Sequence, residues 1–151
     1  DPACAALEIA VRFHAYAEQK GRGIACAGGL GYALTEPLRN GRQSFCPDAS
    51  FYTGPLPENR MRFIESAPDF AVEVRNEWNY GKAAEEQLAV RRADYFEAGT
   101  QVVWDVDPLA RTITVYRSSA PEQPELFASN QSANAEPAAP GLVVAVDEIF
   151  A

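Results

Sequence analysis

Residues 70–75 read Phe-Ala-Val-Glu-Val-Arg, so that large apolar side chains alternate with small or charged ones. This period of two predicts a β-strand with one face on a hydrophobic core. Glu73 and Arg75 lie together on the opposite face. A carboxylate in such a strand loses much of its hydration unless a partner or a cation accompanies it. Glu73 is therefore a candidate functional residue, and the alternative is an ordinary ion pair between Glu73 and Arg75 on an exposed face.

The elements that follow this strand have the order of an α/β unit. Residues 81–98 show helical spacing, and Gly99 is placed to end the helix. Residues 102–107 read as a strongly apolar strand, and residues 112–116 are predicted to pair with it as a hairpin. A strand, a helix and another strand in this order favour a sheet with the helix packed on one face.

The elements that precede the strand add a second helix and more strands. Residues 3–20 are predicted to form an amphipathic helix, and residues 23–35 two short strands. The Asn40-Gly41 pair is a strong hairpin-turn signal, and a strand is expected over residues 44–52. We therefore expect an α/β fold in which a mixed sheet is flanked by helices.

The length and composition indicate one domain. A chain of 151 residues can bury one good core, so residues 1–151 are expected to form a single domain. Residues 118–141 are rich in Ala, Pro, Ser, Asn and Gln, which predicts a long surface loop or a poorly ordered segment. Residues 142–150 are expected to return to the body of the domain.

Asp48 is a second candidate, because it follows Pro47 inside the strand expected over residues 44–52. Proline cannot donate a ladder hydrogen bond, so this position indicates a sheet edge or a bulge, where functional side chains are often placed. The alternative is that Asp48 belongs to a simple Pro-Asp turn.

Arg91 is a third candidate, because it interrupts the apolar stripe of the helix predicted over residues 81–98. It is spaced by three and four residues from Leu88 and Tyr95. A cation on such a stripe either extends to the solvent or meets an anion inside the protein. Glu73 or a bound phosphate would be a suitable anion.

The three side chains could act together in one metal-assisted reaction. Carboxylate oxygens bind Mg²⁺ or Mn²⁺, such a cation makes water more acidic, and a nearby positive charge stabilises a phosphoryl transition state. We therefore predict phosphodiester hydrolysis, with Asp48 and Glu73 as metal ligands. Arginine cannot act as a general base at neutral pH, so Arg91 is expected to contribute charge alone.

The ordered set of these motifs resembles the Uma-type restriction endonuclease family, a large bacterial family with the PD-(D/E)xK nuclease fold. The resemblance covers nearly the whole chain, and it is specific as a set rather than in any single piece. It is carried by Pro47-Asp48, Val72-Glu73-Val74, the helix end Arg-Arg-Ala-Asp-Tyr-Phe-Glu-Ala-Gly over residues 91–99, and Val-Val-Trp-Asp-Val-Asp-Pro over residues 102–108.

The resemblance implies roles for four residues. Asp48 and Glu73 are the expected ligands of a Mg²⁺ or Mn²⁺ ion. Arg91 occupies the helix position where such proteins commonly carry the catalytic lysine, and Arg75 occupies the older lysine position two residues after the glutamate. Asp48, Glu73, Arg75 and Arg91 are thus the expected catalytic residues. Family members also carry a strand before the first helix, so an N-terminal strand is expected to be missing from this chain.

The resulting expectation is a magnesium-dependent DNA endonuclease that acts as a homodimer, because two related sites suit the cutting of two strands. The alternative is a catalytically weakened relative that binds nucleic acid or a partner protein without cutting. The formal net charge of −8 and the two arginines favour this alternative. Three widely spaced cysteines and the lack of a long apolar run favour a cytoplasmic protein without a membrane segment.

Overall fold

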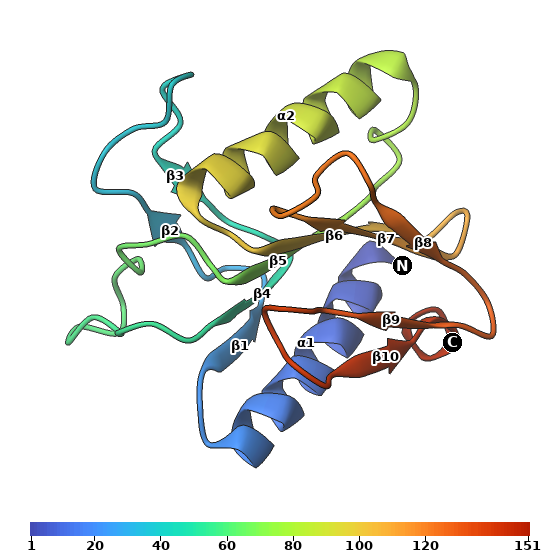
Figure 1. The fold of residues 1–151 in the computed structure, drawn as a ribbon, viewed down its shortest axis with the longest axis horizontal. Coiled ribbons are helices and arrows are strands. Elements are labelled where there is room, and N and C mark those ends of the chain that lie inside the picture. The colour runs from blue at the N-terminus through green and yellow to red at the C-terminus, as the bar shows by residue number, and fades with distance from the viewer.

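The computed structural model describes residues 1–151 as a mixed six-stranded sheet with a long helix on each face (Figure 1). The two helices are α1 (Pro2–Lys20) and α2 (Lys82–Ala98). Across the sheet the strands follow the order β1 (Ile24–Ala27), β4 (Ala49–Tyr52), β5 (Phe70–Val74), β6 (Val102–Asp107), β7 (Thr112–Arg117) and β8 (Glu125–Phe127). The expected α/β fold, a mixed sheet flanked by helices, is confirmed.

The parallel pair β5 and β6 lies at the centre of the sheet, and all other neighbours are antiparallel. Parallel neighbours cannot be joined by a tight turn, so the chain crosses from β5 to β6 through α2. The alternation in β5 is the one expected from the sequence. Phe70 and Val72 belong to the large core beneath α1, whereas Ala71 belongs to the smaller core beneath α2.

The face beneath α1 holds the main hydrophobic core, a cluster of 23 buried residues. Aromatic packing ties the helix to the centre of the sheet: the Phe13 ring stacks on Phe70 with centroids 4.2 Å apart, and Phe70 meets Trp104 edge to face at 5.1 Å. Helix α1 is capped by Asp1 at its start and ends at Lys20, and the following Gly21 adopts the left-handed conformation that glycine tolerates best.

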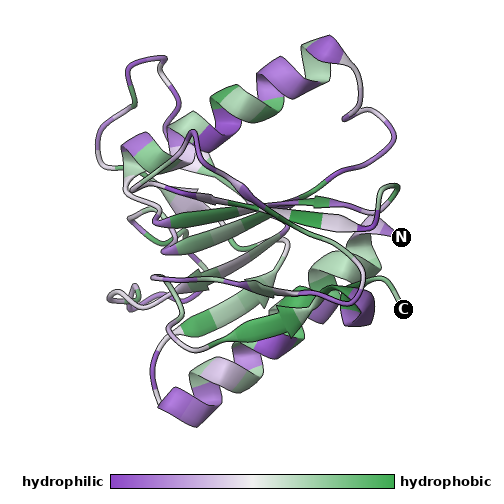
Figure 2. Cartoon of the chain, turned by 45° about the vertical axis from the view of Figure 1, so that its right-hand side comes forward, coloured by the Kyte–Doolittle hydropathy of each residue, from purple (hydrophilic) through white to green (hydrophobic).

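The face beneath α2 is more polar. Its core contains seven buried hydrophobic residues, and α2 itself buries only Leu88, Asp94 and Tyr95. Figure 2 shows this contrast, with the central strands in green and much of α2 in purple. Charged side chains of the sheet therefore have room and partners on this side, and both Glu73 and Arg75 lie here.

The strand expected over residues 44–52 is divided in two. Ser44–Phe45 (β3) pairs with Tyr32–Ala33 (β2) in a small separate sheet, across the predicted Asn40-Gly41 turn, while β4 joins the main sheet. Pro47 lies between the two pieces, where its missing N–H cannot continue a ladder. The break leaves Asp48 immediately before β4.

Residues 118–141 differ from the expected long surface loop. They include β8 and β9 (Ser132–Asn134), and β9 pairs with β10 (Val143–Ala145) before the short helix α3 (Val146–Ile149). Small side chains of this stretch enter the main core, because alanine fits closely without a polar group to satisfy. The buried ones are Ala133, Ala135, Ala138 and Ala139.

None of the helices combines the length and the apolar character that a membrane span requires.

Candidate active site

Glu73 is the centre of the candidate site. It projects from β5 toward α2, and its side chain is only 13% exposed. Both of its oxygens accept hydrogen bonds from α2: the Tyr95 hydroxyl donates to Oε1 at 2.6 Å, and Arg91 Nη1 donates to Oε2 at 2.8 Å. The expected alternative, a pair between Glu73 and Arg75, is not formed.

Tyr95 is a rigid partner for this carboxylate. It is 1% exposed, and its ring stacks on Phe45 with centroids 4.4 Å apart. Burial, followed by the neighbouring Glu73 charge, raises the pKa of Tyr95 far above its ordinary value. The hydroxyl therefore stays protonated and remains a hydrogen-bond donor to Glu73 at any physiological pH.

Arg91 is a more exposed partner, with 46% of its side chain accessible to solvent. The negative charge of Glu73 is the main cause that raises the pKa of Arg91. The sequence places Arg91 and Tyr95 four residues apart, so both reach the same carboxylate from one stripe of α2.

Asp48 lies beside Glu73 across the β4–β5 ladder. Ala49 is paired with Val72, so Asp48 stands opposite Glu73 in the same register. Its backbone N–H donates to the Val72 carbonyl at 3.0 Å, and its Oδ2 accepts from the Val74 N–H at 2.8 Å. The alternative of a simple Pro-Asp turn is thereby replaced by an aspartate fixed next to the central strand.

The electrostatics of Glu73 follow from this arrangement. Burial raises the pKa of the Glu73 carboxyl above its ordinary value, and the Asp48 charge acts in the same direction. The bonds from Tyr95 and Arg91 oppose that shift. Two carboxylates and one arginine thus share a small, partly buried space, and the group carries an excess negative charge when both carboxylates are ionised.

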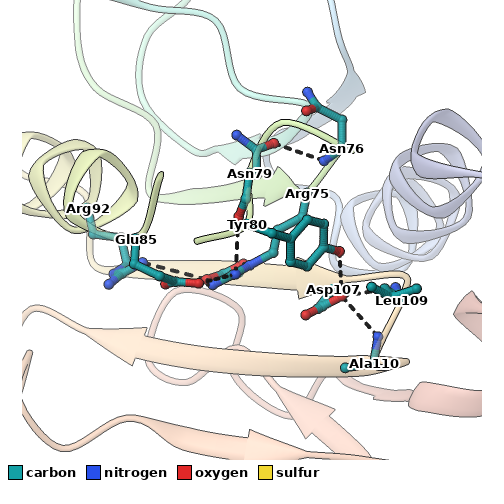
Figure 3. Close-up of polar contacts among 10 residues, drawn as sticks. Arg75, Asn76, Asn79, Tyr80, Glu85, Arg92, Asp107, Leu109 and Ala110 are labelled. Carbon is teal, nitrogen blue, oxygen red and sulfur yellow. Dashed lines mark hydrogen bonds and ion pairs between the residues drawn. The ribbon is translucent and has the colours of Figure 1, made fainter. Parts of the chain in front are cut away.

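Arg75 lies on the same face of β5 but belongs to a different cluster (Figure 3). Its Nε and Nη2 donate to the two oxygens of Asp105 on β6 at 2.8 and 2.7 Å, and it also pairs with Glu85 on α2. Nη1 additionally donates to the Asn79 carbonyl at 3.3 Å. These partners raise the pKa of Arg75, with the Asp105 bonds as the largest cause. Arg75 therefore links β5 to β6, to the start of α2 and to the loop between β5 and α2.

Both acidic residues of β6, Asp105 and Asp107, have structural partners. Asp105 is also approached by Arg92 Nη1 at 3.6 Å, and the Arg92 guanidinium lies 4.0 Å from the centroid of Tyr116. Asp107 accepts from the N–H groups of Leu109 and Ala110, as expected for a residue that opens the hairpin turn.

The donor set at Glu73 suits a hard divalent cation. The protein has no group of three or more His, Cys, Asp or Glu side chains placed to hold a metal ion. Mg²⁺, however, is commonly held by one or two carboxylates while it keeps several waters. Asp48, immediately before β4, and Glu73, opposite it on β5, are a pair of this kind.

The sequence pattern alone does not indicate a functional role for Tyr95. Tyr95 was visible only as an apolar-stripe residue, although its spacing of four from Arg91 could have indicated a shared partner. The Arg75–Asp105 pair had a weaker signal, since parallel register between two strands cannot be read from either strand alone.

Three comparisons with known proteins bear on this site. The family Uma2, described as "Putative restriction endonuclease", matches residues 3–147. The chain is also similar to the crystal structure of "a putative nuclease belonging to DUF820 from Anabaena variabilis ATCC 29413", with a TM-score of 0.73 and 20% identity. That match covers 99% of this chain and 79% of the other, and at this identity it shows the fold alone. No curated protein matches the chain.

Proposed function

Because the chain belongs to the Uma2 family of putative restriction endonucleases, we propose that it is a metal-dependent endonuclease that hydrolyses phosphodiester bonds in DNA. The observation that carries the proposal is the position of the Glu73 carboxylate. It lies opposite Asp48 in the β4–β5 register, and Arg91 of α2 donates a hydrogen bond to it. A nearly buried glutamate beside a second carboxylate is costly for stability alone, and it is typical of a site that receives a cation.

Each residue has a role that follows from its position. Asp48 and Glu73 would supply the oxygen ligands of Mg²⁺ or Mn²⁺. The bound ion would supply positive charge to the phosphodiester and make water more acidic. Tyr95 fixes Glu73 Oε1, and Arg91 supplies the charge that stabilises a phosphoryl transition state.

Arg75 has a supporting place in this proposal. Its guanidinium is held by Asp105 and Glu85, and its side chain is only 12% exposed. It therefore contributes by fixing β5 against α2, which sets the distance between Glu73 and Arg91. Arg91 alone fills the role of the catalytic cation.

Duplex DNA sets two further requirements. The formal net charge of −8 repels a polyanion at long range, so binding depends on local contacts near the site. Two sites suit the cutting of two strands, and we propose a homodimer in which a two-fold axis relates them. Sedimentation of the purified protein with and without DNA tests this assembly.

A protein that binds nucleic acid or a partner without cutting is the second candidate. The acidic charge and the arginines at both lysine positions favour it. It predicts binding of DNA or a protein with no cleavage under any metal condition.

Cleavage of supercoiled plasmid tests the first proposal. The wild-type protein is expected to nick or linearise DNA with Mg²⁺ or Mn²⁺ and to be inactive with a chelator. Asp48→Ala and Glu73→Ala are expected to abolish cleavage, whereas Glu77→Ala, an exposed change in the nearby loop, should preserve it. Equal cleavage by all four proteins would remove the two carboxylates from the mechanism.

A further inference from the structure

The two partners of Glu73 differ in how firmly they are held. Tyr95 is buried and stacked on Phe45, so its hydroxyl stays at Oε1. Arg91 reaches Oε2 from the rim of the site, with nearly half of its side chain in solvent. One oxygen of the carboxylate therefore has a fixed donor, and the other has a partner that can leave.

The charge balance explains why Arg91 is there. Glu73 is almost buried and stands beside Asp48, so its ionised form needs a positive partner. Arg75, two residues along the same face of β5, is already engaged by Asp105 and Glu85. Arg91 is consequently the one cation that pairs with Glu73, and it meets the need that a metal ion would also meet.

We propose that Arg91 and the divalent cation compete for Glu73 Oε2, so that metal binding releases Arg91 toward the phosphate of the substrate. The inference rests on the proposed metal-dependent function. A cation held by Glu73 would neutralise the charge that attracts Arg91, and like charges at such short range would repel. The side chain is exposed enough to turn away without unpacking α2, and its planar guanidinium suits two-point binding of a phosphate.

The competition has a consequence that a simple catalytic role lacks. Removal of Arg91 should tighten metal binding while it abolishes cleavage. A partly exposed ion pair contributes up to about 1 kcal/mol, which corresponds to roughly a fivefold change in apparent affinity.

Calorimetric titration with Mn²⁺ tests this inference. Arg91→Met removes the charge and keeps an unbranched, flexible side chain close in length to the aliphatic part of arginine. Lys82→Met is the matched control, because Lys82 is an exposed cation on the same helix and has no ion pair. We expect Arg91→Met to bind Mn²⁺ about fivefold more tightly than the wild type, and Lys82→Met to bind it with wild-type affinity. Arg91→Ala provides a second variant, and circular dichroism checks the fold of each protein.

The possible outcomes separate the two proposals. Unchanged or weaker Mn²⁺ binding by both Arg91 variants would overturn the competition and leave the nuclease function standing. The same gain in Lys82→Met would also overturn it, because the effect would then be long-range charge. If Glu73→Gln binds Mn²⁺ like the wild type, or if the wild type itself does not bind Mn²⁺, the proposed metal site fails and the competition fails with it.

Discussion

Among the single residues, Glu73 is the one on which the proposed site depends most. Its position between a buried tyrosine and an exposed arginine gives one carboxylate two different partners. Burial raises the pKa of Glu73, so the ionised form is held at a cost to stability. Such a cost to stability is typical of a residue that is retained for function rather than for folding.

The raised pKa of Glu73 predicts a specific pH dependence. The folded protein keeps the Glu73 proton at pH values where the unfolded chain has lost it. The stability of the wild type relative to Glu73→Gln should therefore be highest below about pH 4.5, the ordinary pKa, and should fall as pH rises through the raised pKa. Urea unfolding of both proteins across this range measures the difference.

Glu85→Gln is the control of opposite sign, because Arg75 lowers the pKa of Glu85. Relative to that variant, the wild type should gain stability as pH rises from the lowered pKa to about 4.5. A pH-independent difference for Glu73→Gln, or a difference of the same sign for both, would contradict the proposed environment of Glu73.

Tyr95 should be more sensitive to loss of its hydroxyl than other buried tyrosines. Tyr95→Phe removes a bond to a carboxylate, and we expect a loss of about 1.5–3 kcal/mol in the free energy of unfolding at neutral pH. Tyr32→Phe is the matched control, because Tyr32 is equally buried but donates to the neutral Ser50 hydroxyl at 2.9 Å. Its expected cost is about 1 kcal/mol. Equal costs in denaturant unfolding would show that Glu73 is not charged when Tyr95 contacts it.

At the scale of elements, Arg75 ties β5, β6 and α2 together at one point. It contacts Asp105 and Glu85, and Arg92 of α2 approaches the same Asp105. The helix buries only Leu88, Asp94 and Tyr95, so this ion cluster adds an important contact that holds it over the sheet. The alignment of Arg91 with Glu73 depends on it.

Arg75→Lys separates this role from a catalytic one. Lysine keeps the charge and restores the usual residue of the motif, but it cannot form the two-point contact with Asp105. We expect the free energy of unfolding to fall by about 2 kcal/mol, the scale of one charge-assisted hydrogen bond, with no gain in cleavage. Arg39→Lys, at a side chain that is 95% exposed, should leave stability nearly unchanged. A rise in cleavage by Arg75→Lys would restore Arg75 to the reacting centre.

The elements themselves were largely predictable from local patterns. The alternation in residues 70–75 and the helical spacing of 81–98 give β5 and α2, and with them the shared face of Glu73 and Arg75. The partners of those two residues were not predictable, because they depend on which strand lies beside β5 and in which register. Asp48 could be nominated from Pro47, but its place opposite Glu73 required the β4–β5 pairing.

At the scale of the whole molecule, the two faces of the sheet differ in how much hydrophobic core they bury. The large apolar core beneath α1 stabilises the domain, and the more polar face beneath α2 holds the proposed site. Residues 118–141 contribute to the face beneath α1, since their alanines complete the main core. Composition suggested a loop there, whereas the alternation Ser-Ala-Asn-Ala over residues 132–135 was the local signal of a strand.

Substitutions in β9 test this assignment. Ala133 is 0% exposed in the main core, so Ala133→Asp places an unpaired charge there and should lower the free energy of unfolding by about 3 kcal/mol or more. Ser132→Asp is the matched control, because Ser132 precedes it on the exposed face of the same strand. Thermal unfolding of both proteins distinguishes a core strand from a surface loop. Equal tolerance of the two changes would favour the loop.

The central claim, that Asp48 and Glu73 together hold a divalent cation, is tested most directly by anomalous diffraction from crystals soaked in Mn²⁺. We predict an anomalous peak within about 2.5 Å of one carboxylate oxygen from each residue. A peak elsewhere on the protein, or no peak at saturating Mn²⁺, would contradict the account.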